Sequence, residues 1–188
     1  LRRQRQMCIR DRYSLYNIKN TDMAINKARR RMGAVVETPA VYLDMTAEEN
    51  LIMQYQILGI PNYNGITELL TLVSLVDCGK KKVKDFSLGM KQRLGIAVAL
   101  CGSPDFLILD EPINGLDPIG IAEVRSFIRK LCDARGKSIL ISSHILSEIS
   151  LLADDIGIID HGVLLEEESL AELEPVSYTH LRAHETLA

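Results

Sequence analysis

Short apolar runs of strand length alternate with helical patterns along most of this chain, and this alternation constrains the fold more than any other feature. The runs are apolar throughout, which is typical of strands buried on both faces. Parallel strands need a crossover connection that is usually a helix. The sequence therefore predicts an α/β fold with a parallel sheet covered on both faces. The predicted strands are 31–37, 106–109, 138–142, 156–160 and 163–166, and the predicted helices between them include 118–135 and 145–153.

One stretch, residues 46–84, carries helical patterns only. Thr46 begins it as the N-cap of a capping box, Thr-Ala-Glu-Glu, and Gly59 has the position of a helix C-cap. A second amphipathic helix is predicted over residues 66–76. This pattern predicts a helical subdomain inserted into the α/β fold, extending over about residues 46–100.

Charge and cysteine content exclude several classes of protein. The net charge is −3, and residues 1–12 hold five arginines and one aspartate, so the rest of the chain is more acidic still. An acidic body argues against a nucleic-acid-binding protein, which needs clustered Lys and Arg. The four cysteines form no CxxC pair, which favours reduced thiols over a zinc site or a disulfide framework. No apolar run approaches the roughly 20 residues of a membrane-spanning helix.

Both ends of the chain resemble translated sequencing-adapter sequence. Residues 1–12 (LRRQRQMCIRDR) and 175–188 (PVSYTHLRAHETLA) are therefore interpreted as non-native segments that flank residues 13–174. The alternative for the first segment is a basic arm that binds nucleic acid or anionic lipid. His180 and His184 have the spacing of a metal pair, but they lie in the second segment without a third ligand.

Two adjacent carboxylates follow the predicted strand at residues 106–109. Asp110 and Glu111 should emerge at the carboxyl edge of the sheet, where ligands of open α/β sheets bind. In extended backbone the two side chains would point to opposite faces, so their roles must differ. One could hold Mg²⁺ through water, and the other could polarise an attacking water. The alternative is a strand that simply ends in solvated acids.

Three further segments have features of a phosphate site. Ser87 is placed to cap a helix, with Gly89 two residues later, and a helix N-terminus of this kind suits an anion. Residues 114–118 (NGLDP) put a turn and an N-cap Asp beside the carboxylates. His144 follows the predicted strand 138–142, at the edge where the carboxylates emerge. Each feature alone also fits an ordinary cap, turn or structural histidine.

Together, these segments resemble the ATP-binding subunit of ATP-binding cassette (ABC) transporters. FSLGMKQR resembles the family's signature motif, FLILDEP its Walker B motif, NGLDP its D-loop and SSHILSE its switch-histidine loop. The resemblance covers about residues 31–174. The residues of these motifs are similar to those of the bacitracin-resistance and lantibiotic-immunity exporter branch. It implies the P-loop NTPase fold of ABC ATPases, with a parallel sheet and an inserted helical subdomain.

The resemblance also implies a role for each matched residue. Asp110 would bind Mg²⁺, Glu111 would be the general base, and His144 would contact the γ-phosphate of ATP. Asp117 would couple the two sites of a dimer and contact the nucleotide. The signature residues that would contact ATP held by the opposite subunit are Ser87, Leu88, Gly89 and Met90.

Three departures from the family pattern stand out. No G-x-x-x-x-G-K-[ST] occurs in the chain, so the P-loop is absent from it, as is the aromatic residue that stacks on adenine. Glu37 stands where most relatives carry the Q-loop Gln, a position that contacts the nucleotide and Mg²⁺. Leu88 and Met90 stand where the commonest signature has Gly and Gln. The sequence therefore predicts an inactive chain that lacks the P-loop strand.

Three functions remain open at this stage. The first is the nucleotide-binding subunit of an exporter, with ATP and Mg²⁺ as cofactors, a second ATP-binding subunit and transmembrane permease subunits as partners, and a peripheral position on the cytoplasmic face of the plasma membrane. The second is an ABC protein of translation or DNA repair. The third is a non-catalytic fragment whose helical subdomain binds a partner.

Overall fold

The computed structural model describes residues 13–169, except for the side chains of residues 134 and 135. By its internal contacts the chain divides into two units, one ending at Ser143 and one beginning at His144, and each is described by itself. The predictions for residues 1–12 and 175–188, including His180 and His184, lie outside the described residues.

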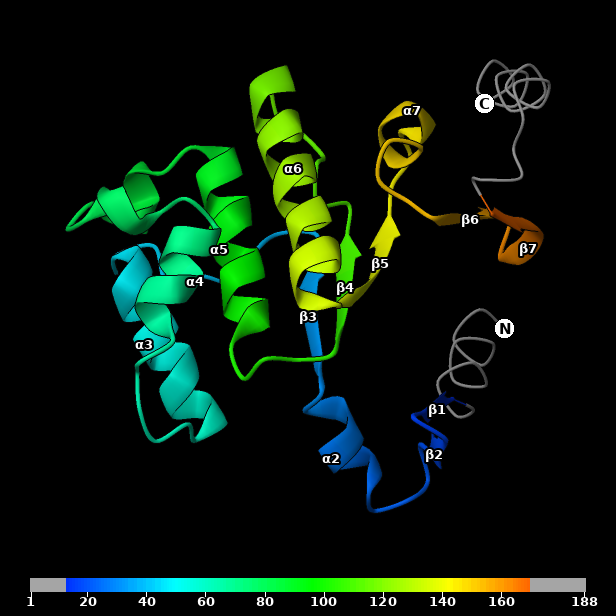
Figure 1. Cartoon of the computed structure of the whole chain (residues 1–188), viewed down its shortest axis with the longest axis horizontal. Helices are drawn as coiled ribbons and strands as arrows, with labels where there is room; N and C mark the ends of the chain where they lie inside the picture. The colour runs from blue at the N-terminus through cyan, green and yellow to red at the C-terminus, as the bar shows by residue number, and fades with distance from the viewer. Residues whose placement is uncertain (1–12, 170–188) are drawn as a thin grey trace. The chain divides into compact units, whose positions relative to one another are not determined.

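Three parallel strands form the central sheet of the first unit (Figure 1). They are β3 (Met32–Val36), β4 (Phe106–Asp110) and β5 (Ser138–Ser142), in the order β3-β4-β5. The strands pair without a shift along their full length, so all three begin at one edge of the sheet and end at the other. The predicted parallel sheet is thereby confirmed, and the predictions for these three strands agree with the observed strands to within one residue at each end.

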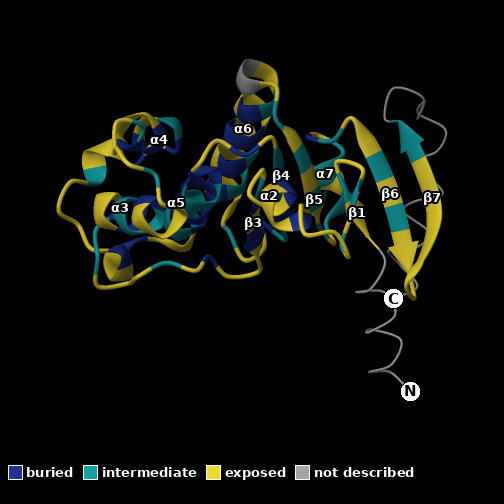
Figure 2. Cartoon of the chain, turned by 90° about the horizontal axis from the view of Figure 1, so that it is seen from below, coloured by how far each residue is buried: buried dark blue, intermediate teal, exposed yellow. Residues whose placement is uncertain are grey.

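Helix α6 (Pro118–Arg135) lies in front of this sheet in Figure 1, and helix α5 (Leu88–Leu100) packs against β3. Their packing buries alternate residues of the strands, including Val35, Leu107 and Leu109. The side chains of the other face are more exposed, and Val36 and Leu140 are 64% and 57% exposed (Figure 2). The prediction of a sheet covered on both faces is therefore wrong for the described residues of the first unit, because no described element of this unit packs on the second face closely enough to bury it.

Two glycines allow α5 to approach the sheet closely. A Cβ atom at Gly33 of β3 would lie 2.2 Å from the carbonyl oxygen of Ala99 in α5. A Cβ atom at Gly95 of α5 would lie 2.5 Å from Cβ of Pro39, in the turn after β3. Both distances are shorter than any normal contact, so only glycine fits at these positions without displacement of the backbone.

The predicted helical subdomain consists of α3 (Ala47–Leu58), α4 (Ile66–Leu72) and two short 3₁₀ helices, η1 (Val76–Cys78) and η2 (Val83–Asp85). The capping box is present, because the Thr46 hydroxyl accepts from the Glu49 N–H while the Glu49 carboxylate accepts from the Thr46 N–H. Gly59 ends α3 in the left-handed conformation, as predicted. Helix α4 is shorter than the predicted 66–76, since Ser74 adopts a positive φ of 55° that a helix cannot continue through.

Residues 13–30 form elements that the sequence did not indicate. A hairpin pairs β1 (Ser14–Leu15) with β2 (Ile18–Lys19) and turns through two residues of positive φ, Tyr16 and Asn17. Helix α2 (Ile25–Arg29) follows it. The Arg31 guanidinium stacks on the Tyr16 ring at 3.9 Å and forms an ion pair with Asp105, which attaches the hairpin to the amino-terminal edge of the sheet.

The described part of the second unit, residues 144–169, contains one short helix and one hairpin. Helix α7 (Leu146–Ile149) has four residues, so the predicted helix over 145–153 is too long. Strands β6 (Asp155–Asp160) and β7 (Val163–Ser169) pair antiparallel around the predicted His161-Gly162 turn, whose residues both have positive φ. In the part of the chain that the model describes, no helix is long and apolar enough to cross a membrane.

Candidate functional site

The carboxyl ends of the three parallel strands lie in line, and the two predicted carboxylates are at this edge. Val36, Asp110 and Ser142 are register partners across the sheet. Glu37 and Glu111 directly follow the first two of these residues. Because ligands of open α/β sheets bind outside the carboxyl ends of the strands, this edge is the candidate site.

The hydroxyl group of Ser142 joins the two carboxylate residues. Its Oγ donates to Oδ1 of Asp110 at 2.5 Å and accepts from the backbone N–H of Glu111 at 3.0 Å. The same N–H also lies 3.2 Å from the backbone oxygen of Ser142. The sequence analysis gave no role to Ser142, although a serine at the end of the neighbouring strand was visible in the SSH segment.

Glu111 does not continue the extended backbone of β4. Its φ is 49°, in the left-handed region that non-glycine residues seldom occupy. The expectation that Asp110 and Glu111 alternate as in a strand is therefore wrong, because the chain turns sharply at Glu111. The backbone oxygen of Glu111 then accepts from the N–H of Asn114 at 3.1 Å, which closes the turn into the NGLDP segment.

The oxygen ligands at this edge fit a magnesium ion of the kind that nucleotide-binding proteins use. Among residues 13–169 no cluster of three or more His, Cys, Asp or Glu side chains could hold a metal by itself. Mg²⁺, however, is usually held by one or two carboxylates together with waters and substrate phosphates. Asp110 is half-buried and already oriented by Ser142, so its carboxylate suits that partial role.

The signature segment, Ser87–Met90, forms the first turn of α5. The Ser87 hydroxyl accepts from the N–H of Met90 at 3.2 Å, which confirms the predicted N-cap. Ser87 and Leu88 are exposed, while Gly89 and Met90 are half-buried. An exposed N-terminus of a 13-residue helix combines unpaired backbone N–H groups with the positive end of the helix dipole, and both favour an anion.

The D-loop packs against the signature segment. A Cβ atom at Gly115 would lie 3.4 Å from Cδ2 of Leu88, and one at Gly89 would lie 3.8 Å from Cδ2 of Leu116. Asp117 then caps α6, since its Oδ1 accepts from the N–H of Gly120 at 3.0 Å. The structure thus brings two of the predicted motifs into direct contact, and it gives Asp117 a structural role in addition to any functional one.

Glu37 follows β3 in the same conformation as Glu111 follows β4. Its φ is 56° and its side chain is exposed, next to the strand end that pairs with Asp110. The following turn is firmly packed through the contact between Pro39 and Gly95. A pocket of about 250 Å³ lies beside this turn, lined by residues of β3, the turn and α5.

His144 is the first residue of the second unit. Its side chain is exposed, and it follows the end of β5 by two residues along the chain. The predicted contact of His144 with the γ-phosphate is therefore supported by its place in the sequence alone and stays a prediction.

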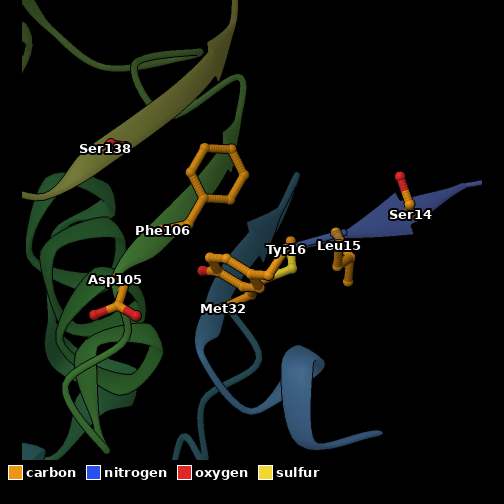
Figure 3. Close-up of a pocket in the computed structure, with 7 residues that line it drawn as sticks. All are labelled: Ser14, Leu15, Tyr16, Met32, Asp105, Phe106 and Ser138. Carbon is orange, nitrogen blue, oxygen red and sulfur yellow. The ribbon is translucent and has the colours of Figure 1, made fainter. Parts of the chain in front are cut away.

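A second pocket, of about 270 Å³, lies at the opposite edge of the sheet (Figure 3). Met32, Phe106 and Ser138, the first residues of the three strands, line it together with Asp105 and residues of the β1–β2 hairpin. It lies a full strand length from Asp110, so it has no part in the candidate site.

Comparison with known proteins agrees with the motifs and the fold. The family model described as "ABC transporter" matches residues 8–114. The bacitracin transport ATP-binding protein BcrA of Bacillus licheniformis is 56% identical over 138 residues, which are 73% of this chain and 45% of that protein. The lantibiotic transport ATP-binding protein SrtF of Streptococcus pyogenes is 49% identical over 140 residues, 74% of this chain and 60% of that protein. The chain thus spans about half the length of these relatives.

A solved structure supports the fold independently. The ATP-binding cassette MJ0796, solved as a dimer bound to ADP and Pi, superposes with a TM-score of 0.69 over 83% of this chain and 72% of that chain. Its sequence identity of 23% makes this likeness evidence of fold alone. The predicted fold class and the predicted resemblance are both confirmed, and the chain belongs to the ABC transporter family.

Proposed function

We propose that this chain is the catalytic part of a nucleotide-binding subunit that couples ATP hydrolysis to export. The observation that carries the proposal is the pair Asp110 and Glu111 at the carboxyl edge of a parallel sheet, followed at once by the D-loop turn. Neither the carboxylate pair nor the D-loop turn alone would be specific for this function. Their order along the chain and their packing against the signature segment, through Leu88 and Gly115, support one function for all three.

The two carboxylates have different tasks in this proposal. Asp110, together with Glu37, would hold Mg²⁺ through its oxygens or through bound water. When bound, Mg²⁺ neutralises charge that develops on the transferred phosphoryl group. Glu111 would accept a proton from the attacking water, at the sharp backbone turn that ends β4. His144 would donate a hydrogen bond to the γ-phosphate.

A second subunit would complete each nucleotide site. The first turn of α5, formed by Ser87, Leu88, Gly89 and Met90, would contact the phosphates of ATP held by the partner through its backbone N–H groups. Asp117 would connect this contact to the other site, because the D-loop packs on the signature segment. The dimeric form in which MJ0796 was solved supports this arrangement.

The exported substrate and the membrane partner are proposed from the relatives. The names of BcrA and SrtF refer to transport of bacitracin and of lantibiotics, which are peptide antibiotics. We therefore infer a peptide antibiotic as the substrate and a permease as the partner, with the subunit at the cytoplasmic face of the plasma membrane. The helical subdomain and the segment that precedes it offer exposed apolar side chains for the permease, among them Tyr42, Leu43 and Ile57.

The test uses a completed protein, in which a P-loop-bearing amino-terminal region of an ABC ATPase is fused ahead of this chain. Glu111→Gln should reduce ATP turnover by about 10²–10⁴-fold, because the amide keeps the size of the side chain but cannot accept a proton. ATP binding, measured by equilibrium dialysis, should persist. Glu167→Gln in β7 is the matched control and should turn over ATP like the parent. Normal turnover by Glu111→Gln would refute the assignment of the general base.

A further inference from the structure

Ser142 lies at an exposed strand end, yet its hydroxyl group makes two hydrogen bonds in the candidate site. A serine hydroxyl offers one donor and two acceptor lone pairs. Here the donor is used on Asp110 and an acceptor on the backbone of Glu111. One hydroxyl group therefore contacts both residues that the proposed reaction depends on.

The register of the sheet explains why Ser142 can make both contacts. Asp110 and Ser142 are direct partners in neighbouring parallel strands, so their side chains point to the same, open face of the sheet. On the other side of Asp110 the partner is Val36, which has no polar side-chain atom. Of the two register partners, Ser142 alone can orient the carboxylate.

We propose that Ser142 is a positioning residue for ATP hydrolysis, an inference that rests on the function proposed above. It fixes the rotation of the Asp110 carboxylate through Oδ1 and leaves the remaining lone pairs of that carboxylate for a cation or its bound water. It also anchors the backbone of Glu111 in the left-handed turn, from which the general base projects. Groups that orient a metal-binding carboxylate in this way typically change metal affinity or activity by about 10–100-fold when removed.

A matched pair of variants isolates the hydroxyl group. Ser142→Thr keeps the hydroxyl group. Ser142→Val has the same shape as the threonine variant but carries a methyl group in place of that hydroxyl. Both residues are β-branched and suit a strand. In the 188-residue chain, amide hydrogen exchange at Glu111 should be up to about tenfold faster in Ser142→Val than in the parent, because the N–H then keeps only its longer contact, 3.2 Å, with the backbone oxygen of Ser142. Exchange in Ser142→Thr should match the parent. Equal exchange in all three would overturn the proposed anchoring.

The catalytic effect is measured in the completed protein. Ser142→Val should lower kcat by about 10–100-fold while the KM for ATP changes little, and Ser142→Thr should restore kcat. Ser138→Ala, at the other end of the same strand, is the control and should behave like the parent. If the valine variant does not fold, Ser142→Ala serves as the hydroxyl-free variant.

The possible results separate this inference from the proposed function. Parent-like kcat in Ser142→Val, with turnover lost in Glu111→Gln, would overturn the role of Ser142 and leave the proposed function standing. Equal losses in the threonine and valine variants would also overturn it, because the hydroxyl would then be irrelevant. Normal turnover by Asp110→Asn and Glu111→Gln would refute the proposed function itself.

Discussion

At the scale of single residues, Cys101 shows how burial alone changes the chemistry of a side chain. It ends helix α5, is 7% exposed, and its Sγ lies 3.5 Å from the backbone oxygen of Ala97. Burial raises the pKa of the Cys101 thiol to about 12, because the thiolate would lose its hydration. Cys78 and Cys132 are only partly buried.

We expect Cys101 to react much more slowly with iodoacetamide at pH 8 than Cys78 or Cys132. The thiolate is the reactive form, and a pKa near 12 reduces its population at pH 8 by about 10³-fold relative to an ordinary thiol. Peptide mass spectrometry after timed alkylation measures the rates. In urea the three thiols should react equally. Rapid labelling of Cys101 in the native chain would contradict its burial.

The same shift affects stability at high pH. The pKa of Cys101 is higher in the folded chain than its ordinary value of 9, so the unfolded chain loses this proton first as the pH rises. The contribution of this group to the free energy of unfolding is complete below about pH 9 and is lost progressively between about pH 9 and 12. A Cys101→Ala variant should lack this part of the alkaline destabilisation.

At the scale of elements, Gly33 in β3 and Gly89 in α5 differ in how closely other atoms surround them. A Cβ at Gly33 would lie 2.2 Å from a backbone oxygen of α5, whereas a Cβ at Gly89 would have no atom closer than 3.8 Å. The first glycine is needed for packing. The second stands in the first turn of α5, where a Cβ would make only ordinary contacts with Leu116 and Gly120, beside the anion site proposed above.

Alanine substitutions should therefore separate packing from function. Gly33→Ala should destabilise the chain by about 1–3 kcal/mol, because α5 must move away from β3. Gly89→Ala should leave stability unchanged or slightly raised, since alanine favours a helix. In the completed protein, however, it should weaken ATP turnover by crowding the phosphates. Urea unfolding followed by circular dichroism measures both variants, and a stable Gly33→Ala would contradict the close approach.

Elements whose signals are local could be predicted from the sequence, and those that depend on distant contacts could not. The caps of α3, α5 and α6 rest on residues within one turn, Thr46, Ser87 and Asp117, and all three were predicted. Helix α2 has no side-chain cap and the strands of the first hairpin have two residues each, so neither gave a pattern.

In the candidate site, Asp110 and Glu111 were predicted from their motif. The link through Ser142 was not, because it depends on the register between strands.

At the scale of the whole chain, the described residues include the groups that we propose act on a phosphate but no P-loop to hold it. The chain contains no G-x-x-x-x-G-K-[ST] segment. In the family, that loop grips the phosphates through backbone N–H groups and a lysine. Asp110, Glu111 and the signature segment make no comparable cradle, since Ser87 would contact a nucleotide bound to the partner.

The 188-residue chain should therefore hydrolyse no measurable ATP, while the completed protein should do so in the presence of Mg²⁺. Phosphate release measured on both purified proteins, with and without EDTA, tests this expectation. Circular dichroism on the short chain controls for loss of fold. Magnesium-dependent turnover by the short chain, abolished by Glu111→Gln, would show that these residues can hold a nucleotide without a P-loop.

The equal length of the three parallel strands has a consequence for how such a chain can change during evolution. Each strand has five residues, and all three are paired without an offset. A single deletion inside β5 would shift Ser142 out of line with Asp110 and would exchange the buried and open sides of the strand. The number of residues in each strand is therefore under a constraint of its own, separate from the constraint on which side chains the strand carries.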